Sequence, residues 1–306
     1  MKQQPFSHRV KAEAAESITG RKKCDICLLG MLLFGNSFTE NELLFQTESE
    51  ICRDLFVRLI THAAEDKDAA QVYTYRHRGR KPLHSIRIEN AENISAVSNR
   101  LGFEISEYNR TLEGLELTEK TVGTFLAGVF FACGSVADPE KEYHLEFVVP
   151  TQALAEQLLE LLEVALGINA KCVQRGVSSV VYIKGSESIE DVLTVIGATN
   201  HSLEIMNVKV YKDIRNLANR RTNCDTANSD RQNRTAERQI AAIEAIKASK
   251  GGISQLPDEL LQVAEMRLKY PLHSLDELSK EFLPPLSKSG LNHRLARIEA
   301  IAKDLK

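Results

Sequence analysis

The sequence lacks any stretch of about 20 apolar residues, the length that a helix needs to cross a bilayer. Its longest apolar runs, such as residues 122–133, are far shorter. The first 23 residues are polar and charged, and they do not contain the apolar segment of a signal peptide. These two absences predict a cytoplasmic protein that has no membrane partner.

Cysteine is sparse, and its spacing does not build a metal site. Of the six cysteines, only Cys24 and Cys27 form a C-x-x-C pair, and no second pair or histidine pair completes a zinc set. Cys27 lies inside an apolar helical pattern, so we interpret these thiols as reduced and structural. The sequence predicts neither a metal ion nor another cofactor.

Charge is distributed unevenly along the chain. Residues 1–208 contain 21 basic and 29 acidic residues, a net charge of −8, whereas residues 209–306 contain 18 and 13, a net charge of +5. A polyanion such as DNA is therefore attracted to the second part and, on average, repelled by the first.

The last 33 residues have the pattern of a helix-turn-helix. A first short helix is predicted to begin at Ser274, because the tetrapeptide 274–277 (Ser-Leu-Asp-Glu) fits a capping box. After a turn at Pro284 and Pro285, a second helix follows whose apolar residues recur at spacings of four, three and four. Its opposite face is polar and basic, without an acidic residue before Glu299, as in a helix that reads DNA. The apolar residues are Leu291, Leu295, Ile298 and Ala302.

Nine residues of this segment are predicted to bind DNA. Base edges are expected to be contacted by Ser289, Asn292 and His293, and phosphates by the basic residues nearby. Gly290 would let the start of the helix lie close to DNA or to the preceding helix. The alternative for His293 is an ordinary surface histidine. The full set is Ser274, Ser287, Lys288, Ser289, Gly290, Asn292, His293, Arg294 and Arg297.

Two segments about a hundred residues apart are similar to each other. Residues 28–37 and 126–135 each form an apolar helical pattern with a glycine, Gly30 or Gly128, at the third position. The glycines would let two helix backbones approach closely where two copies of a repeat meet. Two unrelated apolar helices are the alternative. The elements that follow are predicted at 43–47, 50–64, 71–76, 85–89 and 91–101 in the first copy, and at 143–149, 152–166, 170–174, 177–184 and 189–199 in the second.

These motifs resemble those of a known family. The segment 274–278 (Ser-Leu-x-Glu-Leu) followed by 284–295 (Pro-Pro-x-Ser-Lys-Ser-Gly-x-Asn-His-Arg-Leu) is similar to the C-terminal helix-turn-helix of the WhiA regulators. Residues 223–228 (Asn-Cys-Asp-Thr-Ala-Asn) resemble that family's segment just ahead of its helical domain. The resemblance covers nearly all of the chain. It implies a bacterial regulator linked to sporulation, cell division and chromosome segregation, whose first domain resembles a LAGLIDADG homing endonuclease without catalytic acids.

The resemblance also implies where metal-binding acids of a nuclease would stand. Alignment on the two motif glycines places Gly35 and Cys133 at those positions, and neither offers a hard oxygen ligand for magnesium. Asp138 and Glu140 lie beyond the second motif. The chain is therefore predicted not to be an enzyme, and no catalytic residue is assigned.

The predicted fold class is α+β, a duplicated LAGLIDADG-like αββαββα domain with pseudo-two-fold symmetry followed by an all-α helix-turn-helix domain. The first domain is expected over 1–205, with copies at about 1–110 and 111–205, then a helical linker over 206–226 and the DNA-binding domain over 227–306. Two basic clusters are secondary candidates for DNA contact, with solvated surface as the alternative. They are Arg76, Arg78, Arg80 and Lys81 at a hairpin near Tyr73 and Tyr75, and Arg231, Arg234 and Arg238 on a helix.

The predicted function is sequence-specific binding of double-stranded DNA by a non-enzymatic transcriptional regulator at the nucleoid. Transcription machinery or another regulator is a further candidate partner. One alternative is a protein-interaction scaffold whose acidic first domain binds a division or transcription partner. The other is a metal-dependent endonuclease that takes its acid from outside both motifs.

Overall fold

The computed structural model describes residues 4–76, 78–79, 81–106 and 110–305. The chain divides into two compact units, Met1–Lys212 and Asp213–Lys306. Among the described residues, no helix is long and apolar enough to pass through a membrane.

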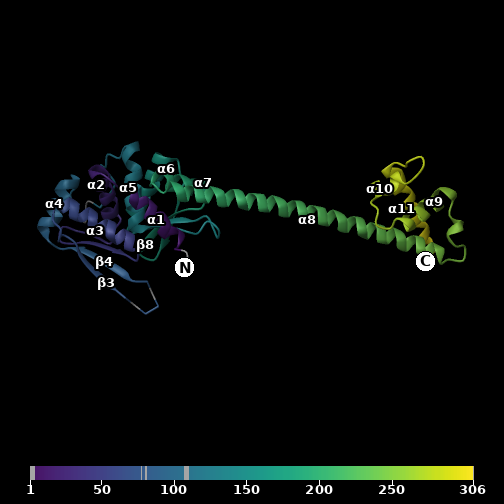
Figure 1. Ribbon diagram of the computed structural model, residues 1–306, viewed down its shortest axis with the longest axis horizontal. Coiled ribbons are helices and arrows are strands. Elements are labelled where there is room, and N and C mark those ends of the chain that lie inside the picture. Colours follow the sequence, from purple (N-terminus) through teal and green to yellow (C-terminus); the bar gives the residue numbers. More distant parts are fainter. Residues whose placement is uncertain (1–3, 77, 80, 107–109, 306) are drawn as a thin grey trace. The chain divides into compact units, whose positions relative to one another are not determined.

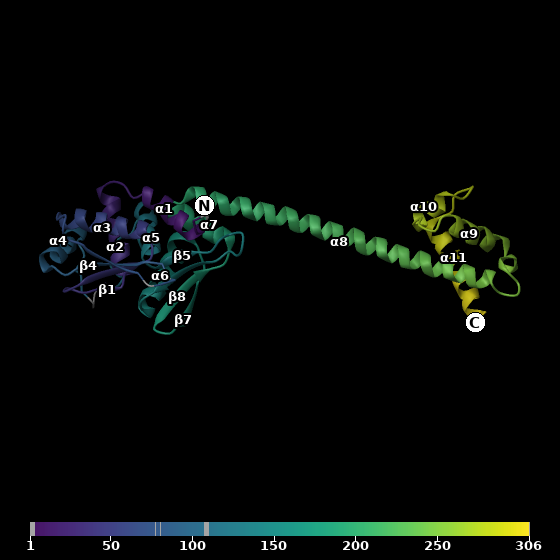
Figure 2. The same cartoon turned by 60° about the horizontal axis from the view of Figure 1, so that its bottom comes forward.

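The first unit consists of two halves with the same order of elements, preceded by helix α1 (Phe6–Glu16). The first half contains α2 (Arg21–Leu33), β1 (Ser37–Phe38), β2 (Leu43–Thr47), α3 (Glu50–Ala64), β3 (Gln71–Tyr75), β4 (Leu83–Ile88) and α4 (Ala91–Leu101). The second contains α5 (Glu119–Cys133), β5 (Gly134–Val136), β6 (Leu145–Val149), α6 (Gln152–Leu166), β7 (Lys171–Arg175), β8 (Ser178–Ile183) and α7 (Ser186–Val195). Figures 1 and 2 show these elements, which confirm the predicted αββαββα repeat.

Each half forms a four-stranded antiparallel sheet, in the orders β1-β2-β4-β3 and β5-β6-β8-β7. The registers correspond, because Leu43 pairs with Ile88 in the first sheet and Leu145 pairs with Ile183 in the second. Helix α3 packs on β2 and β4, and α6 packs on the equivalent strands of the second half. Strands β1 and β5 were not predicted, because two or three residues are too few to show an alternating pattern.

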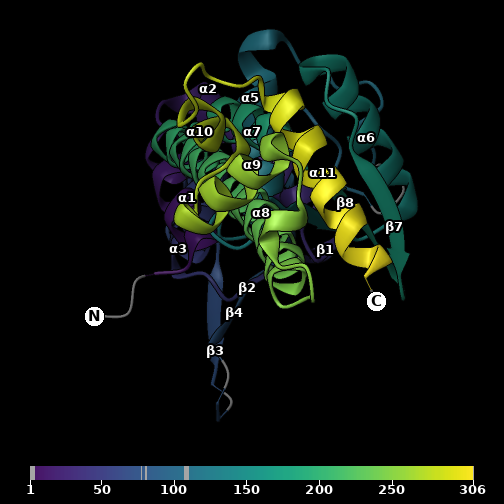
Figure 3. The same cartoon turned by 90° about the vertical axis from the view of Figure 1, so that its right-hand side faces the viewer.

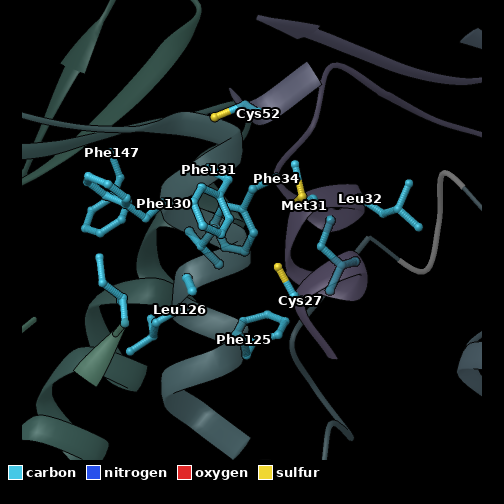
Figure 4. Close-up of a cluster of buried hydrophobic side chains, with 14 of the residues drawn as sticks. Cys27, Met31, Leu32, Phe34, Cys52, Phe125, Leu126, Phe130, Phe131 and Phe147 are labelled. Atoms are coloured by element: carbon cyan, nitrogen blue, oxygen red, sulfur yellow. The ribbon is translucent and has the colours of Figure 1, made fainter. Parts of the chain in front are cut away.

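The halves meet where α2 and α5 cross, inside the apolar core of the unit. A Cβ atom added to Gly128 would lie 2.2 Å from the carbonyl oxygen of Cys27, and one added to Gly30 would lie 2.5 Å from that of Phe125. Figure 4 shows Cys27 and Phe125 on the two facing helices. The predicted close approach of two helix backbones at these glycines is therefore confirmed.

The second unit is helical. It contains the C-terminal part of α8 (Thr199–Lys247), then α9 (Asp258–Lys269), α10 (Leu275–Lys280) and α11 (Lys288–Asp304), with a short 3₁₀ turn, η2 (Ile253–Gln255), after α8. The predicted helical linker over 206–226 lies inside α8, which continues unbroken through the polar stretch 219–234 into the predicted DNA-binding domain. The stretch contains neither proline nor glycine, so nothing in it interrupts the backbone hydrogen bonds of a helix. The core of the second unit includes Ile243, Ile246, Leu260, Val263, Ala264, Leu278, Leu291, Leu295 and Ile298.

Candidate nucleic-acid interface

Helix α10 begins with the predicted capping box. The Ser274 hydroxyl accepts a hydrogen bond from the Glu277 backbone N–H at 3.2 Å, and the Glu277 carboxylate accepts one from the Ser274 N–H at 2.8 Å. The hydrogen bond from the Ser274 backbone holds the pKa of Glu277 below its ordinary range. Ser274 therefore fixes the start of α10, and its predicted contact with DNA stays a prediction.

Helix α11 begins at a second serine cap. The Ser287 hydroxyl accepts from the Gly290 N–H at 3.1 Å. A Cβ added to Gly290 would lie 3.0 Å from that same hydroxyl oxygen. The nearest neighbour of this glycine is thus the cap of its own helix, and not the preceding helix. Glycine lets the capping hydroxyl sit close to the first turn.

The two faces of α11 differ as predicted. The apolar residues Leu291, Leu295, Ile298 and Ala302 are all buried against the core of the second unit. Figure 3 shows α11 in yellow beside α9 and α10, the two helices that it contacts. The outer face is not needed for packing, so its side chains are free to meet a ligand. The exposed residues on that face are Lys288, Ser289, Asn292, His293 and Arg297.

Arg294 is less available than its neighbours. Its side chain is 30% exposed, and its Nη2 lies 3.6 Å from the Glu259 carboxylate of α9. This ion pair ties α11 to α9 and partly neutralises the guanidinium. A phosphate contact by Arg294 would have to compete with Glu259 or share the guanidinium with it.

The basic residues of α8 lie on its exposed surface. Arg231 and Arg234 are exposed, and Arg238 is exposed as well but forms an ion pair with Glu299 of α11 at 3.1 Å. That pair braces α8 against α11. Arg231 and Arg234 therefore have freer guanidinium groups than Arg238 for a phosphate contact.

The hairpin between β3 and β4 carries the other predicted basic cluster. Arg76, Arg78 and Lys81 are exposed, and Tyr73 and Tyr75 are each 45% exposed. Figure 1 shows strands β3 and β4 running out beyond the helices of the first half. Arg80, the fourth predicted residue, lies outside the described residues. Contact of this cluster with DNA stays a prediction.

The ends of α2 and α5 carry Gly35 and Cys133, the two positions that the resemblance in sequence aligned with metal-binding acids, and a thiol and cations lie there. Burial raises the pKa of the Cys133 thiol to about 12, against a smaller lowering by Lys11 and Arg110. The thiol donates to the Val129 carbonyl oxygen at 3.4 Å. Arg110 donates to the carbonyl oxygens of Leu33, at 2.8 Å, and of Gly35. A neutral thiol and a guanidinium group do not attract a divalent cation.

No cluster of three or more His, Cys, Asp or Glu side chains suited to a metal ion occurs within the part of the chain that the structure describes. Cys24 and Cys27, the C-x-x-C pair, are free thiols on α2. Burial raises the pKa of Cys27 far above its ordinary value.

One polar residue of the second unit escaped the sequence-based predictions. Arg267 of α9 is 1% exposed and lines a cavity between α8, α9 and the starts of α10 and α11. A signal was present, because Arg267 follows Val263 and Ala264 at spacings of four and three and so continues the buried stripe of α9.

Two protein-family descriptions match this chain. "WhiA LAGLIDADG-like domain" matches residues 122–215, and "WhiA C-terminal HTH domain" matches residues 218–302. The first match falls on the second half of the duplicated unit. The second covers the capping box, the turn and the exposed face of α11.

Curated relatives are similar over about two thirds of the chain. "Probable cell division protein WhiA" of Clostridium tetani is 44% identical over 205 residues, which cover 67% of this chain and 63% of that protein. The protein of the same name from Clostridium novyi is 46% identical over 182 residues, which cover 60% and 57%. The chain therefore spans less than two thirds of the length of these relatives.

Solved structures show the same architecture. Full-length DUF199/WhiA from Thermatoga maritima has a TM-score of 0.59 and 25% identity, with 99% of each chain covered. The N-terminal LAGLIDADG domain of DUF199/WhiA has a TM-score of 0.52 and 19% identity, covering 64% of this chain and 91% of that one. The second likeness concerns the fold alone.

Proposed function

The chain belongs to the WhiA family, and we propose that it is a sequence-specific, non-enzymatic DNA-binding protein that regulates transcription in cell division and chromosome segregation. The name of the curated relatives, "Probable cell division protein WhiA", supports the cellular role. The helix-turn-helix description that matches residues 218–302 supports DNA binding.

The observation that carries the proposal is the two-faced character of α11. One face is buried, while the other presents serine, asparagine, histidine and arginine side chains to solvent. Asn292, His293 and Arg297 offer donors and acceptors that suit base edges and phosphates in the major groove. An acidic residue is absent from the first turn of the helix, so nothing there repels the DNA backbone.

The absence of enzymatic activity is proposed from the ends of the two motif helices. Nuclease chemistry by a metal-activated water needs carboxylates close to the scissile phosphate. Cys133 and the carbonyl-bound Arg110 stand in that region instead. Incubation of the full chain with supercoiled plasmid and Mg²⁺ is expected to leave the plasmid intact, and accumulation of nicked plasmid would show a surviving endonuclease.

The DNA-binding proposal is tested by removing two exposed side chains of α11 together. His293→Ala with Arg297→Ala is expected to weaken binding to sheared chromosomal DNA at least about 30-fold, because each of the two lost contacts contributes about 1 kcal/mol or more. Both residues are exposed, so the midpoint of urea unfolding should not change. Gel-shift titration and urea unfolding measure the two quantities.

The matched control is Lys303→Ala, an exposed basic residue in the last turn of the same helix. It should reduce affinity much less than the double variant. Affinity of the wild-type chain should also fall steeply with salt, because counterions are released from the phosphates on binding. Equal affinities of the double variant and the wild type would contradict the assignment of α11.

The cellular role is tested by mapping bound chromosomal DNA for the full chain and for a variant that lacks residues 274–306. The regulator hypothesis expects discrete bound regions that disappear with the deletion. Retention of those regions would favour the scaffold alternative, in which the first unit is recruited by a protein partner.

A further inference from the structure

A cavity of about 340 Å³ lies within the second unit, between α8, α9 and the starts of α10 and α11. Its volume is within the range of small-ligand pockets. Three basic residues from three different helices line it, Arg231 of α8, Arg267 of α9 and Lys288 of α11. We propose that this pocket binds a phosphate group. Arg231 and Lys288 bind the phosphate oxygens, and the buried Arg267 contributes positive charge behind them.

The buried arginine is the strongest argument for an anion. Arg267 is 1% exposed, and its Nη1 donates to the His273 carbonyl oxygen at 2.7 Å. Its Nε has no hydrogen-bond partner, and no carboxylate of the described residues forms an ion pair with it. A guanidinium without a counter-charge is costly to bury, and a bound anion would remove that cost.

A second nitrogen in the pocket wall is also unsatisfied. The Nδ1 atom of His273 is buried without a partner, and the ring is held by stacking on Tyr270 with centroids 4.7 Å apart. His273 lines the same cavity as Arg267. A protonated Nδ1 can donate a hydrogen bond to a phosphate oxygen. Two unpaired buried nitrogens at one cavity indicate a ligand with several acceptor atoms.

The acidic residue in the wall, Asp276, is engaged mainly by Lys280 and acts only weakly on Lys288. Asp276 is paired with Lys280, whose Nζ lies 2.5 Å from the carboxylate. That hydrogen bond lowers the pKa of Asp276, which therefore stays ionised and engaged with its lysine. The remaining charges in the pocket are all positive, which favours a phosphate over a neutral ligand.

Two sources can supply this phosphate. Lys288 is the first residue of α11, so a bound phosphate would contact the start of the helix that we propose to read DNA. One source is a backbone phosphate of the same DNA duplex, and this alternative rests on the proposed function. The other is the phosphate group of a free ester such as a nucleotide, which would couple DNA binding to a small molecule.

The first experiment uses inorganic phosphate as the probe, without DNA. Thermal unfolding of the full chain is recorded in phosphate and in chloride at equal ionic strength and pH. Phosphate at millimolar concentration is expected to raise the unfolding temperature of the wild type by mass action. Arg231→Ala and Lys288→Ala should each lose this shift, and because both residues are exposed the variants should remain folded. Lys288 distinguishes this cavity from the neighbouring hollow that Arg231 lines together with Arg234 and Arg238.

The matched control is Arg221→Ala, an exposed arginine of the same helix that does not line the cavity. It should keep the full response to phosphate. An equal response in the wild type and in Arg231→Ala would mean that phosphate binds elsewhere, and it would overturn the proposal, as would the absence of any response.

The second experiment separates the two sources and also separates this proposal from the proposed function. A DNA phosphate is indicated if Arg231→Ala weakens DNA binding about tenfold and reduces the slope of affinity against salt by about one. A free phosphate ester is indicated if DNA affinity is unchanged while the response to phosphate is lost. If the wild type does not bind DNA but responds to phosphate through Arg231, the proposed function is contradicted and the proposal of a phosphate pocket is supported.

Discussion

The two halves of the first unit share their framework and differ on their surfaces. Both have the same strand order, and both place a phenylalanine, Phe45 or Phe147, at the same buried position of the second strand. Their exposed hairpins differ. The first connects β3 and β4 through the basic segment 76–82, whereas the second turns directly from Arg175 to Ser178.

The outer faces of the two sheets also differ, because the first is more polar than the second. One row across β2, β4 and β3 contains Gln46, Ser85 and Tyr73, which pair with one another in the register. The equivalent row across β6, β8 and β7 contains Val148, Val180 and Val173. The middle residues of the two rows, Ser85 and Val180, are buried, so the rows differ toward solvent at Gln46 and Tyr73 against Val148 and Val173. Polar side chains can bind a nucleic-acid backbone, and valines cannot. The halves thus retain what folding requires and diverge where a ligand could bind.

The largest expected effect tests the shared framework. Gly128→Ala places a methyl group 2.2 Å from the Cys27 carbonyl oxygen, so α2 and α5 must separate. We expect a loss of about 3 kcal/mol in the free energy of unfolding, at the upper end of the cost of overpacking. Urea denaturation measures it. As a control, Gly185→Ala meets only ordinary contact with Ser188, 3.6 Å from its Oγ, and should change stability little.

A smaller effect is expected where the halves diverge. The triple variant Arg76→Ala, Arg78→Ala and Lys81→Ala should weaken binding of the full chain to DNA about tenfold at low salt and reduce its salt dependence. The matched control is the double variant Lys171→Ala and Arg175→Ala in β7 of the second half, and it should weaken DNA binding less. Fluorescence anisotropy with a labelled duplex provides the affinities. Equal losses in both variants would mean that the two surfaces do not differ in function.

The smallest effect concerns α1, which has no counterpart in the second half. Burial alone would raise the pKa of Glu13, but hydrogen bonds from Asn200 and His201 hold it below its ordinary value of about 4.5. A lowered pKa stabilises the fold above the ordinary pKa, and this stabilisation disappears as the pH falls through the folded-state value.

Glu13→Gln should therefore unfold at a lower temperature than the wild type at pH 7, by roughly 2 °C. The difference should vanish in acid, below the ordinary pKa of a glutamate. Glu16→Gln, on the same helix but exposed, serves as the control and should match the wild type throughout. A pH-independent difference for Glu13→Gln would indicate lost packing and not lost charge.

Much of this architecture could be predicted from the sequence because its signals are local. The bounds of β2, α3, α6 and α4 follow from apolar periodicity and from the polar residues that precede each helix. The buried stripe of α11 was also predictable, since Leu291, Leu295 and Ile298 recur on one helical face. Gly30 and Gly128 could be assigned to a helix contact because the motif occurs twice.

Features that depend on distant partners could not be predicted. The pairing of Arg294 with Glu259 and of Arg238 with Glu299 depends on how α8, α9 and α11 pack, which no spacing reveals. The same holds for Arg110, whose bonds to the Leu33 and Gly35 carbonyl oxygens join residues about 75 positions apart. The continuity of helix α8 from the linker into the second unit was not predicted for another reason, because its polar middle lacks the apolar periodicity that normally indicates a helix.

The glycine contact between α2 and α5 has a consequence for genetics. When a bulky substitution damages a packed interface, a smaller residue opposite it commonly restores the fit. Here the atoms that an added methyl would strike all belong to the main chain, including the Cα atom of the opposing glycine, so no opposing side chain can be made smaller. Second-site suppressors of a defect at Gly30 or Gly128 should therefore not arise at the opposing position, and both copies of the repeat must keep this residue together.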